Sequence, residues 1–152
     1  MARLTLLGGP PGVGKTSVLK HLPKELATLD ADDFVGSAAL PRDQAIEMVK
    51  CEALRLLTDS KNNNVLVSWV FARPLLYEPF MATTRSVSLV HLVCTAAELE
   101  SRLRKRGDIE LLEFALDRLH LIESLNFPRI DTTGKSSTEI AALICAFATG
   151  QL

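Results

Sequence analysis

The sequence lacks an excess of charge of either sign. Its 152 residues include 17 Lys and Arg against 18 Asp and Glu, which gives a formal net charge of −1. A balanced charge creates no extended field that attracts nucleic acid or an anionic membrane, so we expect neither as a partner. Any anion must therefore be bound at a local site.

Cysteines and long apolar runs are also scarce. The three cysteines, Cys51, Cys94 and Cys145, form no Cys-x-x-Cys pair. We interpret them as reduced, buried small side chains of a cytoplasmic protein. The apolar run from Leu4 to Leu7 is too short for a signal peptide, and no run approaches the 18 residues of a membrane span. A soluble cytoplasmic protein is therefore predicted.

The length and the 47% apolar content predict one globular domain over residues 1–152. Strand-like and helix-like segments alternate along it. The expected strands are 3–8, 26–29, 65–71, 87–94 and 127–131, and the expected helices are 15–21, 41–58, 74–84, 95–106, 108–125 and 136–147. This alternation predicts an α/β domain in three layers, with helices on both faces of a five-stranded parallel sheet. Ligands of such sheets bind beyond the carboxyl ends of the strands.

A glycine-rich loop follows the first expected strand. Residues 9–16 read Gly-Pro-Pro-Gly-Val-Gly-Lys-Thr, a complete G-x-x-x-x-G-K-[ST] phosphate loop between a strand and a helix. A chance match in a chain of this length has a probability on the order of 1%. The glycines let backbone amides turn toward a phosphate, Lys15 reaches the β- and γ-phosphates, and Thr16 can bind Mg²⁺. The residues predicted to bind the nucleotide here are Gly9, Pro10, Pro11, Gly12, Val13, Gly14, Lys15, Thr16 and Ser17.

Two carboxylates end the second expected strand. Asp30 and Asp32 are two residues apart, so on an extended chain they would point to the same side, toward the phosphate loop. One can accept the proton of an attacking hydroxyl, and the other can hold Mg²⁺ together with Thr16. We favour Asp32 as the base and Asp30 as the metal ligand, although this spacing does not decide between them. Capping of the following segment by solvated acids is the alternative.

This phosphate loop, followed by a strand ending Leu-Asp-Ala-Asp-Asp-Phe, resembles the small P-loop kinases of metabolites and antibiotics. That group includes shikimate kinase, gluconate kinase, adenylylsulfate kinase and chloramphenicol phosphotransferase. The resemblance implies a nucleoside-monophosphate-kinase-like fold of the P-loop NTPase class with a short lid. It also implies that Asp32 contacts the substrate hydroxyl.

Four basic residues lie within five positions, from Arg102 to Arg106. At helical spacing Arg102 and Arg106 share a face, where they can approach one anion or one stacked base. By the resemblance, Arg102 lies near the adenine and Arg106 near the transferred phosphate, where it stabilises developing charge. The alternative is a solvated basic helix end, which the helix dipole favours.

The resemblance weakens at the third expected strand. No acid completes a Walker B element there, and Ser68 is the nearest polar residue. Shikimate kinases carry a glycine-rich stretch after the third strand that seats their substrate, and residues 68–73 stand at that place here. Shikimate is therefore disfavoured as the acceptor. Trp69, Phe71 and Arg73, with the helix from Pro41, are our candidates for an acceptor pocket that suits a ring-bearing or anionic molecule; burial of Trp69 in the core is the alternative.

The sequence thus predicts an enzyme that transfers the γ-phosphate of MgATP to a hydroxyl of a small molecule. Lys15, Asp32 and Arg106 are its expected catalytic residues, ATP and Mg²⁺ its cofactors, and the protein is a monomer or a homodimer. An ATPase or switch module that acts on a protein partner is the alternative. The scattered histidines His21, His91 and His120 indicate no metal site, and His91 lies in an apolar strand.

Overall fold

The computed structural model describes residues 2–36, 39–59, 61–83 and 86–151. In chain order its elements are β1 (Arg3–Gly8), α1 (Lys15–Leu19), β2 (Ala27–Asp30), α2 (Ala31–Val35), α3 (Arg42–Thr58), β3 (Asn64–Ser68), α4 (Pro74–Met81), β4 (Val87–Val93), α5 (Ala96–Arg106), the 3₁₀ turn η1 (Ile109–Leu111), α6 (Leu112–Ser124), β5 (Arg129–Asp131) and α7 (Ser137–Ala148). Within these ranges, no helix is both long enough and apolar enough to cross a bilayer.

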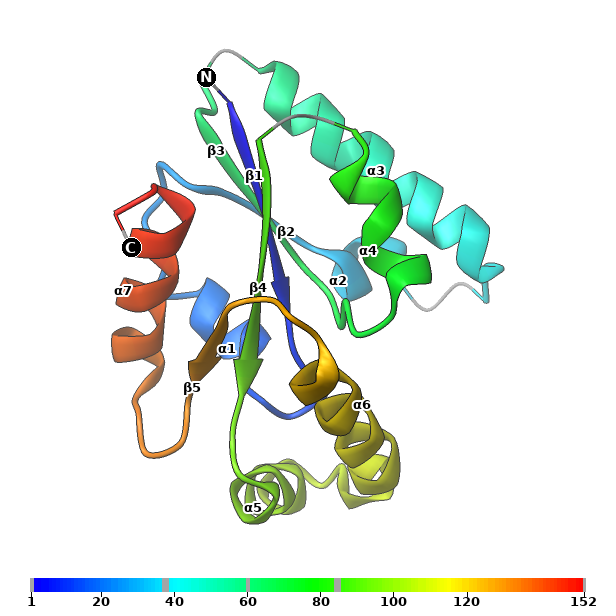
Figure 1. The fold of residues 1–152 in the computed structure, drawn as a ribbon, viewed down its shortest axis with the longest axis vertical. Coiled ribbons are helices and arrows are strands. Elements are labelled where there is room, and N and C mark those ends of the chain that lie inside the picture. The colour runs from blue at the N-terminus through cyan, green and yellow to red at the C-terminus, as the bar shows by residue number, and fades with distance from the viewer. Residues whose placement is uncertain (1, 37–38, 60, 84–85, 152) are drawn as a thin grey trace.

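The five strands form one parallel sheet in the order β2-β3-β1-β4-β5. Helices α1 and α7 cover one face, α3 and α4 cover the other, and α5 and α6 lie beyond the carboxyl ends of the strands (Figure 1). The predicted three-layer α/β/α fold is therefore confirmed. The register pairs Ser68 with both Leu7 and Asp30, so β1, β2 and β3 end at one level.

Two apolar clusters hold the layers together. Alternate residues of a strand face opposite sides of the sheet, so Leu4 and Leu6 pack against α3 and α4 while Leu7 packs toward α1 and α7. Helix α5 joins the cluster that contains Leu7 through Leu99 and Leu103, which are fully buried. The helix that carries the basic residues is thereby anchored beside the sheet.

Several predicted boundaries differ from the structure. Strand β3 ends at Ser68 rather than at residue 71, because the chain then turns and Phe71 takes a left-handed φ of 45°. Asp30 is the last residue of β2, but Asp32 lies in the short helix α2, so the extended-chain argument for Asp30 and Asp32 is wrong. The helix expected from residue 108 begins instead as the 3₁₀ turn η1.

Both predicted helix caps are present, whereas the predicted burial of the cysteines is only partly correct. Thr95 caps α5 by accepting from the Glu98 amide, and Ser136 and Glu139 form a complete capping box on α7. The expected end of α4 at Thr84 lies outside the described residues. All three cysteines are free and Cys94 is buried, but Cys51 is exposed on α3 and Cys145 is only half-buried, so the predicted burial is wrong for these two.

Candidate active site

The phosphate loop joins β1 to α1 in a strained backbone path. Gly12 and Gly14 have φ values of 86° and 106°, a region that residues with side chains rarely adopt. A Cβ on Gly12 would also lie 2.7 Å from Leu103 Cδ2 of α5. Because α1 begins at Lys15, its first amides have no acceptor within the helix and are free to bind an anion.

Lys15 turns back over this loop. Its Nζ donates to the carbonyl oxygens of Gly9, at 2.6 Å, and Pro10, at 3.0 Å. Burial lowers the pKa of Lys15 to about 8, and Asp32 and Asp30 partly oppose that effect. The ammonium is therefore poorly hydrated and within electrostatic range of both acids, which makes it a strong partner for a phosphate oxygen.

Thr16 and Asp30 meet beside the loop. The Thr16 hydroxyl donates to Asp30 Oδ2 at 3.2 Å, because β2 ends at the same level as β1. A hydroxyl and a carboxylate are the oxygen ligands that Mg²⁺ prefers, and this pair is close enough to share one ion. The described residues contain no group of three or more His, Cys, Asp or Glu side chains that would hold a metal. The two residues therefore fit an ion that takes its other ligands from phosphate and water.

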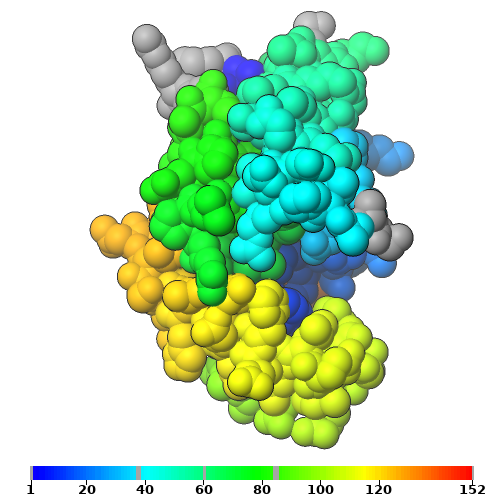
Figure 2. All heavy atoms as spheres, turned by 90° about the vertical axis from the view of Figure 1, so that its right-hand side faces the viewer, coloured from blue at the N-terminus to red at the C-terminus, as the bar shows by residue number. Residues whose placement is uncertain are grey.

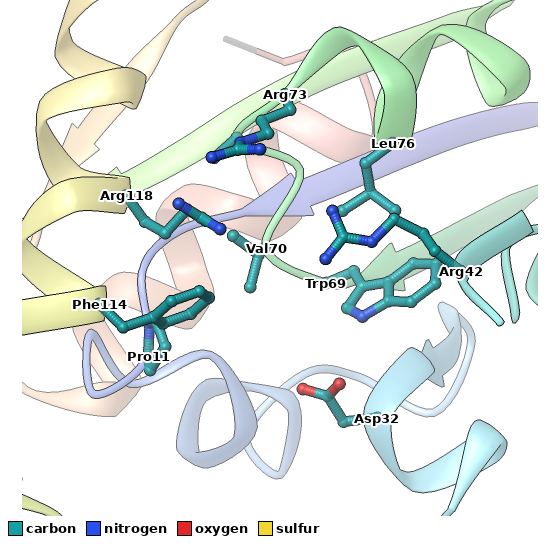
Figure 3. A pocket seen from close by; sticks show the side chains of 10 residues that line it. Pro11, Asp32, Arg42, Trp69, Val70, Arg73, Leu76, Phe114 and Arg118 are labelled. Atoms are coloured by element: carbon teal, nitrogen blue, oxygen red, sulfur yellow. The ribbon is translucent and has the colours of Figure 1, made fainter. Parts of the chain in front are cut away.

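Asp32 lies in the first turn of α2, facing both Lys15 and Trp69. Burial and the charge of Asp30 raise the pKa of Asp32, whereas Lys15 and a hydrogen bond with the Trp69 side chain lower it. Figure 3 shows the carboxylate pointing toward the indole nitrogen. Asp32 therefore lies near the phosphate loop, but by way of a helix rather than an extended chain.

A cavity of about 270 Å³ opens above Asp32, and we call it the Trp69 cavity. Figure 3 shows three guanidinium groups directed into it, from Arg42, Arg73 and Arg118. Its lining residues are Pro11, Asp32, Arg42, Trp69, Val70, Ala72, Arg73, Leu76, Phe114 and Arg118. In the space-filling view, this side of the molecule is hollowed between α3 and α6, where blue atoms of the N-terminal segment are visible (Figure 2).

Only some of the residues predicted for the acceptor pocket line this cavity. Trp69 and Arg73 line it, and the helix expected from Pro41 contributes Arg42. Phe71 does not line it: its ring is fully buried and packs edge-to-face on Phe80, 5.4 Å between centroids. The turn after β3 is the reason, because it sends the Phe71 side chain into the core.

A second cavity, of about 380 Å³, lies on the other side of the phosphate loop, and we call it the Arg102 cavity. Its lining residues are Gly12, Val13, Gly14, Ser17, Val18, Glu98, Arg102, Lys105, Arg106, Lys135, Ser137 and Ile140. The predicted pair Arg102 and Arg106 therefore does share one cavity. The phosphate loop forms one wall of each cavity.

Arg102 is the most extensively bonded side chain of this region. Its Nη1 donates to Val13 O at 2.8 Å and to Thr132 Oγ1 at 3.0 Å, and its Nη2 donates to Thr132 O at 3.1 Å. Glu98 adds an ion pair at 3.1 Å. Because these bonds occupy the edge of the guanidinium, its flat face is what remains for a ligand. Arg102 is thus suited to stacking on a base rather than to clamping an anion.

Arg106 has a different environment one turn later. Its side chain is 53% exposed and pairs with Asp108 at 2.8 Å. Its positive charge nevertheless contributes to the lowered pKa of Lys15, which places the two cations within electrostatic range. A phosphate between them would relieve this repulsion.

The sequence matches a known family over residues 6–114, a span that includes the phosphate loop, both acids and the basic helix; the family is described as AAA domain. The chain belongs to the AAA domain family. No curated protein matches this AAA domain in sequence.

Solved structures share the fold of this AAA domain along almost its whole length. The tunicamycin resistance protein of Deinococcus radiodurans is 18% identical with a TM-score of 0.72, covering 97% of this chain and 95% of its own. A gluconokinase from Sinorhizobium meliloti 1021 is 16% identical with a TM-score of 0.69, covering 98% and 95%. A shikimate kinase from Acinetobacter baumannii, in complex with shikimate, is 18% identical with a TM-score of 0.67, covering 99% and 95%. The predicted likeness to small P-loop kinases is confirmed for the fold.

Sequence patterns indicated the helix from Pro41 but not Arg42 itself, and they gave no sign of Leu76, Phe114 or Arg118 in the Trp69 cavity. Arg42, Phe114 and Arg118 come from α3 and α6, far apart in the chain. Arg118 stacks on the Phe114 ring, 4.2 Å from its centroid, and pairs with Asp117. The spacing of four residues between Phe114 and Arg118 was a signal for this pair, but nothing local indicated which cavity α6 would face.

Proposed function

We propose that this protein transfers the γ-phosphate of MgATP to a hydroxyl group of a small molecule. One observation carries the proposal: two cavities flank the phosphate loop, and Asp32 lines the Trp69 cavity while it is electrostatically coupled to Lys15. A nucleotide in the Arg102 cavity would present its last phosphate at the loop. An acceptor in the Trp69 cavity would meet it from the opposite side, as in-line transfer requires.

The nucleotide side would be built from local parts. The loop amides and Lys15 bind the phosphates, and Arg102 offers its face to the base. Thr16 and Asp30 would hold Mg²⁺, which supplies neutralisation of the phosphate charge. Arg106 would stabilise charge on the phosphoryl group during transfer.

Asp32 would act on the acceptor. Its carboxylate takes the proton of the attacking hydroxyl while the oxygen forms a bond to the γ-phosphorus, and the bond from that phosphorus to the β–γ bridging oxygen breaks, releasing ADP. The raised pKa of Asp32 makes it a better proton acceptor than an ordinary carboxylate. Lys15, next to it, keeps the carboxylate ionised before the reaction.

The acceptor cavity favours a particular chemistry. Three guanidinium groups face one carboxylate, and Trp69, Phe114 and Leu76 supply apolar walls. This excess of positive charge suits an acceptor that carries an acidic group, and the flat walls suit a ring. The solved structures of the same fold include one of a shikimate kinase with shikimate, which is the kind of enzyme this proposal describes.

A screen of acceptors, read by coupled ADP release, tests the proposal. Acidic ring-bearing alcohols, acidic open-chain alcohols and neutral alcohols form three matched sets. We expect release above background with members of the first set and a smaller response with the other two. Weak ATP hydrolysis that no acceptor stimulates would contradict the proposal and favour the ATPase or switch alternative.

A further inference from the structure

His91 is a buried polar residue that the proposed reaction does not use. It lies on β4 with no exposed surface, opposite Gly8 in the parallel register. A Cβ on Gly8 would lie 2.5 Å from His91 Cδ2, so the imidazole fills the space that this glycine leaves. Gly9, the first residue of the phosphate loop, comes next in the chain. The ring therefore packs directly under the start of the loop.

The imidazole makes one hydrogen bond. Its Nε2 is 2.8 Å from the carbonyl oxygen of Phe71, and because a carbonyl only accepts, Nε2 carries the hydrogen. Nδ1 has no partner among the described residues. A buried ring nitrogen without a partner destabilises the fold, and an apolar side chain of similar size would avoid that cost. The bond to Phe71 is therefore what distinguishes a histidine at this position.

Phe71 is the residue at which such a bond has most effect. In the described part of the chain, it is the only residue other than glycine with a positive φ. That conformation is unfavourable for a residue with a bulky side chain, so its surroundings must hold it. Its ring packs edge-to-face on Phe80 and Trp69, and its carbonyl is held by His91.

The turn at Phe71 shapes the Trp69 cavity. Trp69 and Val70 come before it and Ala72 and Arg73 after it, and all four line the cavity. The Val70 carbonyl also accepts from the Gly9 amide at 3.1 Å, which ties the same turn to the phosphate loop. A change at Phe71 would thus move the cavity wall relative to the loop.

We propose that His91 is a positioning residue that holds the strained turn at Phe71 through its Nε2–H, and so sets where Trp69 and Arg73 stand in the acceptor cavity. His91 lines neither the Arg102 cavity nor the Trp69 cavity. The effect of His91 on acceptor binding rests on the proposed function, whereas its effect on the conformation of the turn does not.

The chain contains one tryptophan, and it stands in this turn. Trp69 fluorescence therefore reports the turn without any substrate. His91→Phe and His91→Leu fill the space without a donor, while His91→Gln retains a side-chain N–H near the position of Nε2. We expect both apolar variants to shift the emission of Trp69 and increase its quenching by acrylamide, and His91→Gln to stay near the wild type.

Thermal unfolding followed by circular dichroism confirms that each variant is folded, and two apolar variants are used so that one folded example is sufficient. A purely structural role predicts a changed melting temperature with unchanged Trp69 emission. Wild-type emission and quenching in a folded apolar variant would overturn the proposal, and so would His91→Gln behaving like His91→Leu.

Kinetics provide the second readout once an acceptor is identified. The apolar variants should raise KM for the acceptor, by on the order of tenfold, because small displacements of positioning groups are costly. KM for ATP should not change, and His91→Gln should restore the acceptor KM. If no acceptor is found, the proposed function fails, but the fluorescence result still decides the role of His91.

Discussion

The two cavities on either side of the phosphate loop are built in different ways. The Arg102 cavity is lined by short runs of residues from three segments, the phosphate loop with α1, helix α5 and the start of α7, and its central arginine is held by bonds to Val13, Thr132 and Glu98. The Trp69 cavity takes one residue each from the phosphate loop, α2, α3 and α4, two from α6, and the rest from the turn before α4. Its arginines Arg42 and Arg73 form no ion pair with any described residue. The Arg102 cavity is thus preorganised for one ligand, the nucleotide. The Trp69 cavity instead keeps unpaired positive charge that can select a particular acceptor.

Lys15 lies in the phosphate loop that contributes residues to both cavities, so its loss should have the largest effect. Lys15→Ala removes the cation next to the transferred phosphate, and we expect phosphoryl transfer to fall at least ~1000-fold. Coupled ADP release measures it. Lys20→Ala, at the exposed end of α1, is the matched control and should retain full activity. Transfer that survives in Lys15→Ala would remove the loop from the mechanism.

Asp32 lines the Trp69 cavity and not the Arg102 cavity, so its substitution distinguishes the two. Asp32→Asn should leave ATP affinity within about twofold, because the side chain lies in the other cavity, and lower turnover by at least ~100-fold through loss of the base. Calorimetry gives the affinity and ADP release gives the turnover. Asp33→Asn, which removes the adjacent carboxylate that lines neither cavity, is the control. Normal turnover in Asp32→Asn would sink the assigned base and leave Asp30 as the candidate.

Arg106 tests whether the basic helix takes part in transfer. Arg106→Ala should lower kcat by about 100-fold because it removes charge stabilisation at the phosphoryl group. Arg104→Ala is matched to it, since Arg104 lies on the same helix, is 66% exposed and pairs only with Glu100 among the described residues. Equal effects of the two substitutions would indicate a solvated basic helix end instead.

Substitutions at Arg102 and at Arg118 should have opposite effects on the binding of ATP and of the acceptor. Arg102→Lys keeps the charge but loses the bonds to Thr132, so ATP should bind about tenfold more weakly while acceptor affinity is retained. Arg118→Lys should leave ATP binding unchanged and weaken the binding of an acidic acceptor. Calorimetry with each ligand measures both, and an identical pattern in the two variants would mean that the cavities are not independent.

The smallest effect is expected from pH. Bound phosphates favour the charged form of Lys15, whose pKa in the free protein is about 8. ATP affinity should therefore decline as the pH rises above about 8, and binding in that range should take up a proton. Calorimetry in two buffers of different ionisation enthalpy detects this uptake. Its absence above pH 8 would show that Lys15 does not pair with the nucleotide.

Local patterns were sufficient for the features that depend on neighbours in the chain. The phosphate loop, the cap of α5 and the placement of Arg102 and Arg106 on one helix face follow from spacings of three to six residues. The end of β3 could not be predicted in the same way. Residues 65–71 are continuously strand-like, and the turn at Phe71 is held by His91 of β4 and by Phe80 of α4.

The sequence by itself determined the α/β alternation, the phosphate loop with Lys15 and Thr16, and the acids that follow β2, because each depends on local backbone preferences and short spacings. The tertiary structure alone decided that Asp32 faces Trp69, that Phe71 turns into the core, and that Arg42, Arg73 and Arg118 converge. These three arginines are separated by more than 30 residues along the chain. Only the packing of α3 and α6 around the ends of the strands brings their charges into one cavity.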